Sequence, residues 1–333
     1  MRSRTRADTA NAGAGTLGLA DVEAAARPLA GRIVRTPVIP APWLSDSSGP
    51  TVFLKAELLQ HTGSFKTRGV LSRLARATDL ERENGVIGIS AGNHAQALAY
   101  GCKAEGIDCT VVMWGSASEA KKAATRRLGA TVDDTPSGPA EAFERMEVIR
   151  AESGRVLIHP FADPWVIAGQ GTVGLELARD LRELDAVIVP VGGGGLVCGI
   201  AAALRSGGDG PRVIGVEPRG AAAVAEGVAA GAPVTIEPRS LADGLLAPFT
   251  TQICIDLVKA HGIELVQVDE PDIATAMKRV YAEAKLACEP AAAAGVAALL
   301  TGAARVENAR NVVVVVSGGN VDPLVASDIL TRR

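Results

Sequence analysis

The sequence predicts an α/β fold with mainly parallel sheets, and two observations lead to that prediction. Short apolar segments rich in β-branched residues alternate with longer alanine- and leucine-rich segments from about residue 50 to the end of the chain. Several of the short segments, such as `NVVVVVS` at 311–317, are apolar throughout rather than in alternation. That pattern is typical of strands buried on both faces of a sheet, and strands alternating with helices indicate an α/β architecture.

The same two signals place the elements along the chain. The expected strands are the apolar, β-branched segments at 51–57, 85–90, 108–114, 155–160, 186–191, 212–218, 263–268 and 311–317. The expected helices have alanine and leucine at helical spacing, and they include 66–77, 93–106, 118–129, 140–153, 172–185, 271–287 and 291–304. No Pro/Gly/Ser-rich linker marks a domain boundary, so any division of the chain must come from its motifs.

Composition excludes several classes of protein. With 333 residues and a net charge of -3, the chain can form one large or two ordinary domains and has no basic surface for nucleic acid. No apolar run reaches the roughly 18 residues that a membrane span requires. The five cysteines are widely spaced without a C-x-x-C pair, which indicates a reducing compartment and no disulfide or zinc framework. We therefore expect a cytoplasmic protein that does not bind membranes, with residues 1–15 as a flexible tail.

The segment `TGSFKTRG` places Lys66 at the start of an expected helix. A cation is mildly unfavourable there because the helix dipole already supplies partial positive charge. One interpretation is that Lys66 has no special role. The other is that the amine is needed in its neutral form, which is what a nucleophilic lysine requires near pH 7.

Four consecutive glycines, Gly192, Gly193, Gly194 and Gly195, lie between an expected buried strand and a helix that begins near Leu196. A tight turn needs only one or two glycines. Four in a row leave several backbone N–H groups free to bind one anion, and the helix N-terminus adds its dipole. Because no Lys-Ser/Thr pair follows, the loop is not a nucleotide P-loop, and we expect it to bind an isolated phosphate such as that of a cofactor.

A second glycine motif, `GQGTVG` at 169–174, matches the G-x-G-x-x-G pattern of dinucleotide sites. That pattern indicates a dinucleotide site only when it directly follows a strand. Here it follows a segment in which Asp163 and Pro164 have the character of a helix N-cap and first helical residue. We therefore expect the motif to lie inside a helix and not to bind a nicotinamide cofactor.

Polar residues also follow the strand that ends at Ser90. Asn93 and His94 lie at the start of the next helix, where asparagine is an ordinary N-cap and a single histidine usually has a structural role. The same Ser-Ala-Gly-Asn run could instead bind a substrate carboxylate, with Asn93 donating to a ring oxygen of a cofactor. The residues alone leave both interpretations open.

Two further residues are candidates for the same site. Ser317 ends the most apolar strand, at the sheet edge where open α/β sheets bind ligands, and a buried hydroxyl there needs a partner. The alternative is an ordinary Ser-Gly-Gly turn. Glu289 precedes Pro290 at the start of an apolar helix and is either a first-turn carboxylate or an acid of the site.

In order and spacing, the segments `GSFKTRG`, `SAGNHAQ`, `VGGGGL`, `VEP`, `ADG`, `EP` and `SGGN` resemble the pyridoxal-phosphate enzymes of fold type II. Among these, the resemblance is greatest to the threonine/serine dehydratases (ammonia-lyases) and serine racemases. It implies a fold like that of the tryptophan synthase β subunit, with two three-layer α/β domains. The implied large cofactor-binding domain comprises residues 16–78 and 161–333, and the small mobile domain comprises 79–160.

The resemblance implies a role for each candidate residue. Lys66 would bind the cofactor as a Schiff base and act as the catalytic base, with Phe65 beside the ring. The implied residues around the cofactor are Phe65, Lys66, Asn93, Gly192, Gly193, Gly194, Gly195, Leu196, Glu289 and Ser317. The implied substrate-carboxylate site comprises Ser90, Ala91, Gly92, Asn93 and His94.

The implied reaction is β-elimination of a β-hydroxy amino acid, L-threonine or L-serine in the first place, to a 2-oxo acid and ammonia. Serine racemases carry a serine where this chain has Ala91, which has no proton to donate, so racemisation is not expected. Other β-hydroxy amino acids (3-hydroxyaspartate, phenylserine or a specialised-metabolism substrate) stay open as substrates. A β-replacement synthase and a non-catalytic binding protein are less well supported, because such synthases have a Thr-Ser-Gly-Asn-Thr type segment and all the implied cofactor residues are present here.

Relatives in this group often bind a divalent cation through the glutamate of `VEP`, here Glu217, and an acidic residue six positions later. That later position is Ala223 in this chain, and losing a hard oxygen ligand weakens a Mg²⁺ or Ca²⁺ site. We therefore expect no metal site, with Glu217 only a weak candidate. The resemblance also implies a homodimer or homotetramer.

Overall fold

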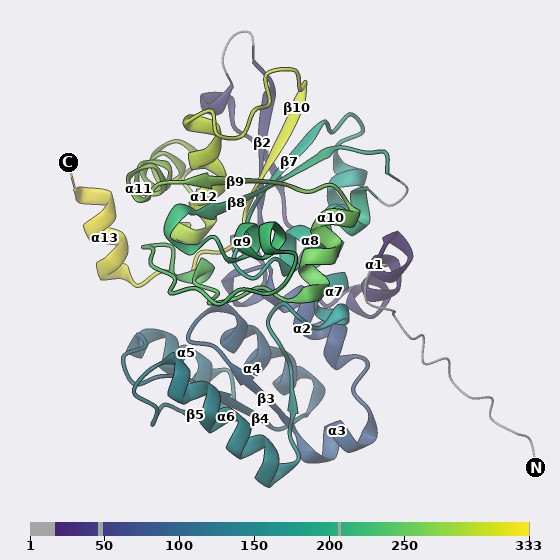
Figure 1. Cartoon of the computed structure of the whole chain (residues 1–333), viewed down its shortest axis with the longest axis vertical. Helices are drawn as coiled ribbons and strands as arrows, with labels where there is room; N and C mark the ends of the chain where they lie inside the picture. The colour runs from purple at the N-terminus through teal and green to yellow at the C-terminus, as the bar shows by residue number, and fades with distance from the viewer. Residues whose placement is uncertain (1–16, 46–48, 206–207, 333) are drawn as a thin grey trace, which may run out of the picture.

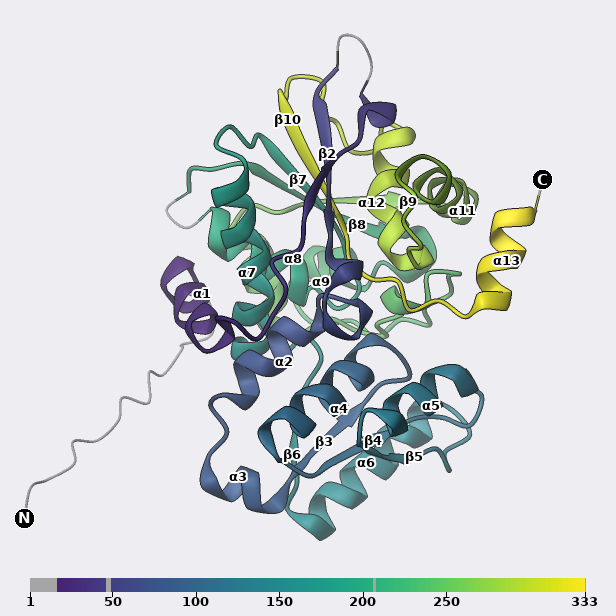
Figure 2. The same ribbon diagram turned by 180° about the vertical axis from the view of Figure 1, so that it is seen from behind.

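The computed structural model describes residues 17–45, 49–205 and 208–332. The tail predicted at 1–15 lies outside these residues. Figures 1 and 2 show two bodies of helices and strands stacked along the long axis of the molecule, each built around its own sheet.

The larger sheet has six strands in the order β1-β2-β10-β7-β8-β9. All neighbours are parallel except β1 and β2. The strands are β1 (Val38–Pro40), β2 (Thr51–Ala56), β7 (Ala186–Pro190), β8 (Arg212–Pro218), β9 (Glu264–Val268) and β10 (Asn311–Val316).

Helices cover both faces of this sheet, as the continuous apolar strands predict. In β10, Val312, Val314 and Val316 face a core formed with α11 and α12, whereas Val313 and Val315 face a core formed with α1, α7, α8 and α10. These helices are α1 (Leu19–Ala26), α7 (Pro164–Asp180), α8 (Gly195–Leu204), α10 (Gln252–Ala260), α11 (Glu270–Arg279) and α12 (Pro290–Leu300). Helices α9 (Ala223–Ala230) and α13 (Pro323–Thr331) complete this part.

The smaller sheet has four parallel strands in the order β5-β4-β3-β6. They are β3 (Val86–Ile89), β4 (Cys109–Val112), β5 (Thr131–Asp133) and β6 (Val156–Leu157). One face packs against α4 (Asn93–Glu105) and α2 (Lys66–Leu74), and the other against α6 (Pro139–Ser153). The remaining helices here are α3 (Asp79–Asn84) and α5 (Glu119–Arg127).

The α/β prediction is confirmed, and every expected strand is present, although 155–160 shortens to β6. The short strands β1 and β5 were not predicted. The helix predicted at 172–185 in fact begins at Pro164 and ends at Asp180, and the one predicted at 271–287 ends at Arg279, where a π-helical turn follows. In the predicted division, all strands of the larger sheet belong to residues 16–78 and 161–333, and all strands of the smaller sheet belong to residues 79–160. That these two parts are domains, and that the smaller one moves, stays a prediction.

The `GQGTVG` motif lies inside α7 and packs helices together. Asp163 caps α7 by accepting hydrogen bonds from the backbone N–H groups of its first turn, as expected. A Cβ atom on Gly169 would lie 2.6 Å from the carbonyl oxygen of Arg68 in α2, and one on Gly171 would lie 2.5 Å from that of Gly199 in α8. The glycines therefore allow α2 and α8 to approach α7 closely, which is a packing role and not a dinucleotide site.

Within the described part of the chain, none of the helices combines the length and the apolar character that crossing a bilayer requires.

Candidate active site

Lys66 is the first residue of α2, and its side chain points to the junction between the two sheets. Its Nζ donates a hydrogen bond of 3.0 Å to the carbonyl oxygen of Pro160, in the segment that joins β6 to α7. The Nζ lies 5.1 Å from the centre of the Phe65 ring. Burial lowers the pKa of Lys66 to about 8, against the opposing influence of Cys254 and Glu289. The neutral fraction of the amine near neutral pH is therefore much larger than that of an ordinary lysine.

The tetraglycine loop connects β7 to α8. The backbone N–H groups of Gly192, Gly193 and Gly194 donate no hydrogen bond to any described residue, and those of the first turn of α8 have no partner within the helix. Gly194 has φ +99°, a left-handed conformation that strongly favours glycine. The carbonyl oxygen of Gly193 accepts a hydrogen bond of 3.1 Å from the Thr250 hydroxyl, which fixes the orientation of that peptide.

Neighbouring walls leave no room for side chains on this loop. A Cβ on Gly193 would lie 2.4 Å from the Phe161 ring, and one on Gly192 would lie 3.2 Å from the Cα of Leu245. The glycines let the loop pack against these walls, and free N–H groups at a helix N-terminus are suited to one compact anion. The loop therefore fits the phosphate of a phosphorylated cofactor.

A chain of amide and carboxylate groups connects α4 to the C-terminal end of β10. The Nδ2 of Asn93 donates to Glu289 Oε1 at 2.7 Å, and Asn93 Oδ1 accepts from Asn320 Nδ2 at 2.7 Å. Asn320 also donates to the Thr62 carbonyl oxygen at 2.7 Å. Burial, and then the charge of Asp243, raise the pKa of Glu289 to about 7. Glu289 is thus a polar member of the site region and not an exposed first-turn carboxylate.

Ser317 lies directly after β10 and is 3% exposed. Its carbonyl oxygen accepts a hydrogen bond of 3.1 Å from the backbone N–H of Phe65. The next residue, Gly318, pairs with Ser64 and accepts from the N–H of Glu289 at 3.1 Å. The end of β10 is therefore held between the segment before Lys66 and the start of α12.

The 90–94 segment forms the N-terminus of α4. The Ser90 hydroxyl accepts from the backbone N–H of Gly92 at 3.2 Å, and Ala91 lies between them. His94 is 2% exposed; its Nε2 donates to the Ile158 carbonyl oxygen at 2.8 Å, and its Nδ1 has no partner among the described residues. Burial and the nearby charge of Lys66 lower its pKa to about 3. His94 is therefore neutral at physiological pH, with one acceptor nitrogen unused.

His159 is a site residue that the sequence analysis missed. Its Nδ1 accepts hydrogen bonds from the backbone N–H groups of Phe161 and Ala162, at 3.3 and 3.0 Å. Burial and the charge of Lys66 lower its pKa to about 4. The residue lies next to Pro160, but the sequence offered no signal, because the segment was assigned to a strand. Asn320 was missed although it belongs to the quoted `SGGN` segment, because its partners Thr62 and Asn93 are distant in sequence.

Glu217 is fully buried at the end of β8 and binds a helix terminus. Its two carboxylate oxygens accept from the backbone N–H groups of Val224 and Ala225 in α9, at 2.8 and 3.0 Å. Burial raises its pKa to about 7. No group of three or more His, Cys, Asp and Glu side chains in the described ranges is arranged to hold a metal ion. The geometry gives Glu217 a structural role as the acid that caps α9.

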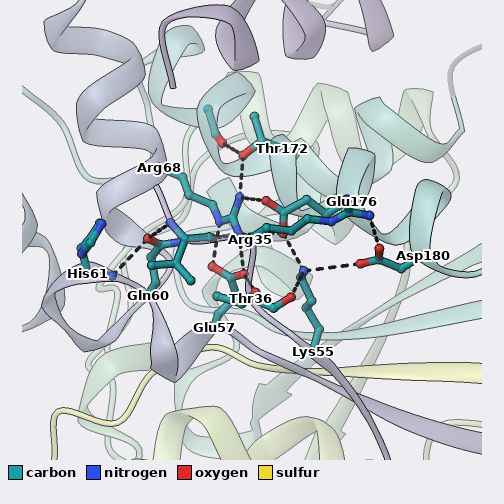
Figure 3. Close-up of polar contacts among 12 residues, drawn as sticks. Arg35, Thr36, Lys55, Glu57, Gln60, His61, Arg68, Thr172, Glu176 and Asp180 are labelled. Carbon is teal, nitrogen blue, oxygen red and sulfur yellow. Dashed lines mark hydrogen bonds and ion pairs between the residues drawn. The ribbon is translucent and has the colours of Figure 1, made fainter. Parts of the chain in front are cut away.

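Figure 3 shows a buried ionic network around Arg68, which follows Lys66 by two positions in α2. Arg68, fully buried two residues after Lys66, donates to Glu57 at 2.7 and 2.8 Å and to Glu176 at 2.7 and 3.0 Å. Lys55 in β2 donates to Glu176 at 2.6 Å. Each buried charge thus has an opposite partner, as buried charges require. The network fixes α2, and with it the base of Lys66, to β2 and α7.

The structure thus groups the predicted residues in one region. Lys66, Asn93, Glu289 and Ser317 are connected through direct contacts and adjacent segments, and the Phe161 ring packs on the glycine loop next to the Lys66 contact at Pro160. An amine of lowered pKa beside an anion cradle fits a phosphorylated aldehyde cofactor. The roles of the individual residues stay predictions.

Comparison with known proteins agrees with this geometry. The family model described as "Pyridoxal-phosphate dependent enzyme" matches residues 29–318. The L-threonine ammonia-lyase of Thermotoga maritima is 38% identical over 316 residues, which cover 94% of this chain and 78% of that protein. The catabolic L-threonine dehydratase of Staphylococcus aureus is 40% identical over 318 residues, covering 94% and 91%.

Solved structures extend the similarity to the whole fold. Maize serine racemase superposes with a TM-score of 0.88 at 32% identity, covering 93% of this chain and 96% of that one. The processed form of threonine deaminase isoform 2 from Solanum lycopersicum superposes with a TM-score of 0.87 at 31% identity, covering 93% and 86%. The chain belongs to the family of pyridoxal-phosphate-dependent enzymes and has the type II fold of that family.

Proposed function

We propose that the chain is a lyase that eliminates water from a β-hydroxy amino acid, L-threonine or L-serine in the first place, to give a 2-oxo acid and ammonia. The observation that carries this proposal is the Lys66 amine of lowered pKa, which donates to the Pro160 carbonyl oxygen, next to the Phe161 ring that packs on the tetraglycine loop. The printed names of the relatives, L-threonine ammonia-lyase and catabolic L-threonine dehydratase, support the same reaction.

When bound, pyridoxal phosphate supplies the electron sink that makes the Cα–H bond of an amino acid acidic. Gly192 to Gly195 and Leu196 would hold its phosphate, Lys66 would bind its aldehyde carbon, and Phe65 would pack beside its ring. Ser317 would bind the ring nitrogen, and Asn93, supported by Glu289, would bind the ring oxygen.

Lys66 is the proposed general base. Its neutral amine can take the Cα proton, and burial provides a neutral fraction near physiological pH. The Pro160 carbonyl oxygen accepts one N–H of the amine, which restricts the directions in which Nζ can point. The Arg68 ion pairs hold the backbone of α2 in place, which fixes the position from which the Lys66 side chain extends.

The segment of Ser90, Ala91, Gly92, Asn93 and His94 is the proposed carboxylate site. The first N–H groups of α4 have no partner inside the helix, and a helix N-terminus favours an anion. His94 stays neutral across the physiological pH range, so it adds no positive charge to the carboxylate site. Ala91 offers no proton, which favours elimination over racemisation.

A second group of candidate substrates stays open. A dehydratase for 3-hydroxyaspartate, phenylserine or another β-hydroxy amino acid would use the same lysine and the same cradle. A β-replacement synthase would share them too, but the `SAGNHA` segment of this chain favours elimination.

We also propose that the protein acts in the cytoplasm as a homodimer or homotetramer, with residues 79–160 closing on the substrate against the rest of the chain. The widely spaced, unpaired cysteines and the near-neutral charge support the first point. The similarity to known enzymes of this family supports the others.

The test follows 2-oxo acid release from L-threonine, L-serine and L-threo-3-hydroxyaspartate by purified protein with pyridoxal phosphate. We expect rapid 2-oxobutyrate release from threonine that disappears in Lys66→Ala. Cofactor binding without oxo acid from any of the three substrates would contradict the amino-acid dehydratase and point to a replacement reaction.

A further inference from the structure

Gln170 is an unusual residue in the interior of this protein. It lies in α7, its side chain is 0% exposed, and neither Nε2 nor Oε1 has a hydrogen-bond partner in the part of the chain that the structure describes. Burying an amide without hydrogen bonds is unfavourable, and native proteins rarely leave both ends of one amide unpaired. The side chain is therefore expected to serve a partner other than the surrounding protein.

The position of the amide identifies that partner. A Cβ on Gly195, the first residue of α8, would lie 3.0 Å from Gln170 Oε1, so the amide lies against the tetraglycine loop. Earlier along the side chain, a Cβ on Gly69 of α2 would lie 3.1 Å from Gln170 Cγ. Gln170 thus extends from α7 between the helix that carries Lys66 and the loop that faces the anion.

Independent features mark this loop as an anion site. Its free backbone N–H groups and the positive end of the α8 dipole favour a compact anion. All of these donors belong to the backbone. An amide NH₂ adds a neutral side-chain donor, and its rotation can present either Nε2 or Oε1 to the same neighbour.

We propose that Gln170 is a phosphate-binding residue of this site and that its amide NH₂ donates to the phosphate held by Gly192–Gly195. This role assigns a function to the amide residue of the `GQGTVG` helix-packing motif. The inference rests on the proposed role of the tetraglycine loop. It makes no use of the identity of the amino-acid substrate.

The test measures cofactor affinity in the full-length chain after removal of bound cofactor. Gln170→Met keeps the approximate volume and removes both polar atoms. We expect the Kd for pyridoxal phosphate to rise about 10-fold or more, as loss of a hydrogen bond to a charged group predicts. The Kd for pyridoxal, which lacks the phosphate, should change by less than about threefold. The phosphorus NMR shift of the bound cofactor should also change, and this readout is independent of activity.

Two further variants make the result decisive. Gln170→Glu keeps the shape but adds an anion, so it should weaken pyridoxal phosphate binding more than Gln170→Met, increasingly as the pH rises. Ser72→Ala alters another fully buried polar residue of the α2–α7 interface, beside Gly169, and should leave the ratio of the two affinities unchanged.

Three results would overturn the inference. One is an equal loss of affinity for pyridoxal phosphate and pyridoxal in Gln170→Met, since a packing defect would act on both ligands. Another is an unchanged affinity of Gln170→Met for pyridoxal phosphate together with a higher thermal stability. That result would mean that the amide has no partner even when the cofactor is bound. If Gln170→Met does not fold, wild-type affinity in Gln170→Glu would overturn it. Failure of the wild-type chain to bind pyridoxal phosphate would instead contradict the cofactor site itself.

Discussion

Asn93 donates a hydrogen bond of 2.7 Å to the buried carboxylate of Glu289, and this bond joins the first turn of α4, on the smaller sheet, to the residue that precedes α12, on the larger. It connects the two sheets through a titratable group. Glu289 has a pKa raised to about 7 by burial and by Asp243, so its proton is more tightly held in the folded chain than in the unfolded one. That difference makes the bond sensitive to pH.

The first prediction concerns this pH dependence. Because the folded pKa is raised, the stabilising contribution of Glu289 is fully present below its unfolded pKa and is lost as pH rises towards 7. Glu289→Gln should therefore gain stability relative to the wild type between about pH 4.5 and pH 7, by at most about 3 kcal/mol. Denaturant unfolding at several pH values measures the difference. A gap between variant and wild type that does not change with pH would contradict the raised pKa.

The pKa of Lys66 predicts the rate at which apoprotein binds its cofactor. Only the neutral amine attacks the aldehyde, so the association rate should rise with pH and level off near 8, the lowered pKa of Lys66. Stopped-flow absorbance on apoprotein measures this rate. An association rate that keeps rising up to pH 10.5, the ordinary pKa of a lysine, would show that the pKa of Lys66 is not lowered.

The glycine loop predicts a specific loss of affinity. Gly193→Ala would place a methyl group 2.4 Å from the Phe161 ring and push the loop away from its anion-binding geometry. We expect a loss of pyridoxal phosphate affinity of about 100-fold or more, equivalent to two charged hydrogen bonds. Gly138→Ala is the matched control, because a Cβ there has no neighbour within 4 Å. Equal behaviour of the two variants in a cofactor titration would refute the loop as the phosphate site.

The ionic network predicts a large cost in stability. Arg68→Met leaves Glu57 and Glu176 without their guanidinium partner in the interior, and breaking a buried pair in this way costs about 3–5 kcal/mol. The double variant Arg68→Met, Glu57→Gln should recover part of that loss, because one uncompensated charge is removed. Urea unfolding of the three proteins measures both effects. A cost below about 1 kcal/mol for the single variant would mean that solvent reaches the network.

The fold class could be predicted from the sequence, and so could the segments that the structure brings together in the candidate site, whose roles stay predictions. Parallel strands have their carboxyl ends at one edge of the sheet. Ser317 and the tetraglycine loop each follow an apolar strand, so the local pattern was enough to predict that both lie at that edge. The short strands β1 and β5 could not, because three residues carry too little periodicity to distinguish a strand from a loop.

Residues whose roles depend on distant partners were not predictable. Arg68 follows Lys66 by two positions, yet its partners Glu57 and Glu176 come from separate elements. Gln170 stood in a motif that was correctly interpreted as helical, and only the folded chain shows its amide against Gly195. Such contacts are fixed by tertiary packing, on which the local pattern carries no information.

The central claim is that Lys66 is the residue that binds the cofactor. Borohydride reduction of the protein loaded with pyridoxal phosphate, followed by proteolysis and mass spectrometry, tests it directly, because reduction makes the lysine–cofactor bond permanent. We predict the modified lysine in the peptide containing `GSFKTRG`, at Lys66, and no labelled peptide in Lys66→Ala. A label on another lysine, such as Lys121 or Lys122 of α5, would contradict the assignment of Lys66 as the cofactor-binding residue.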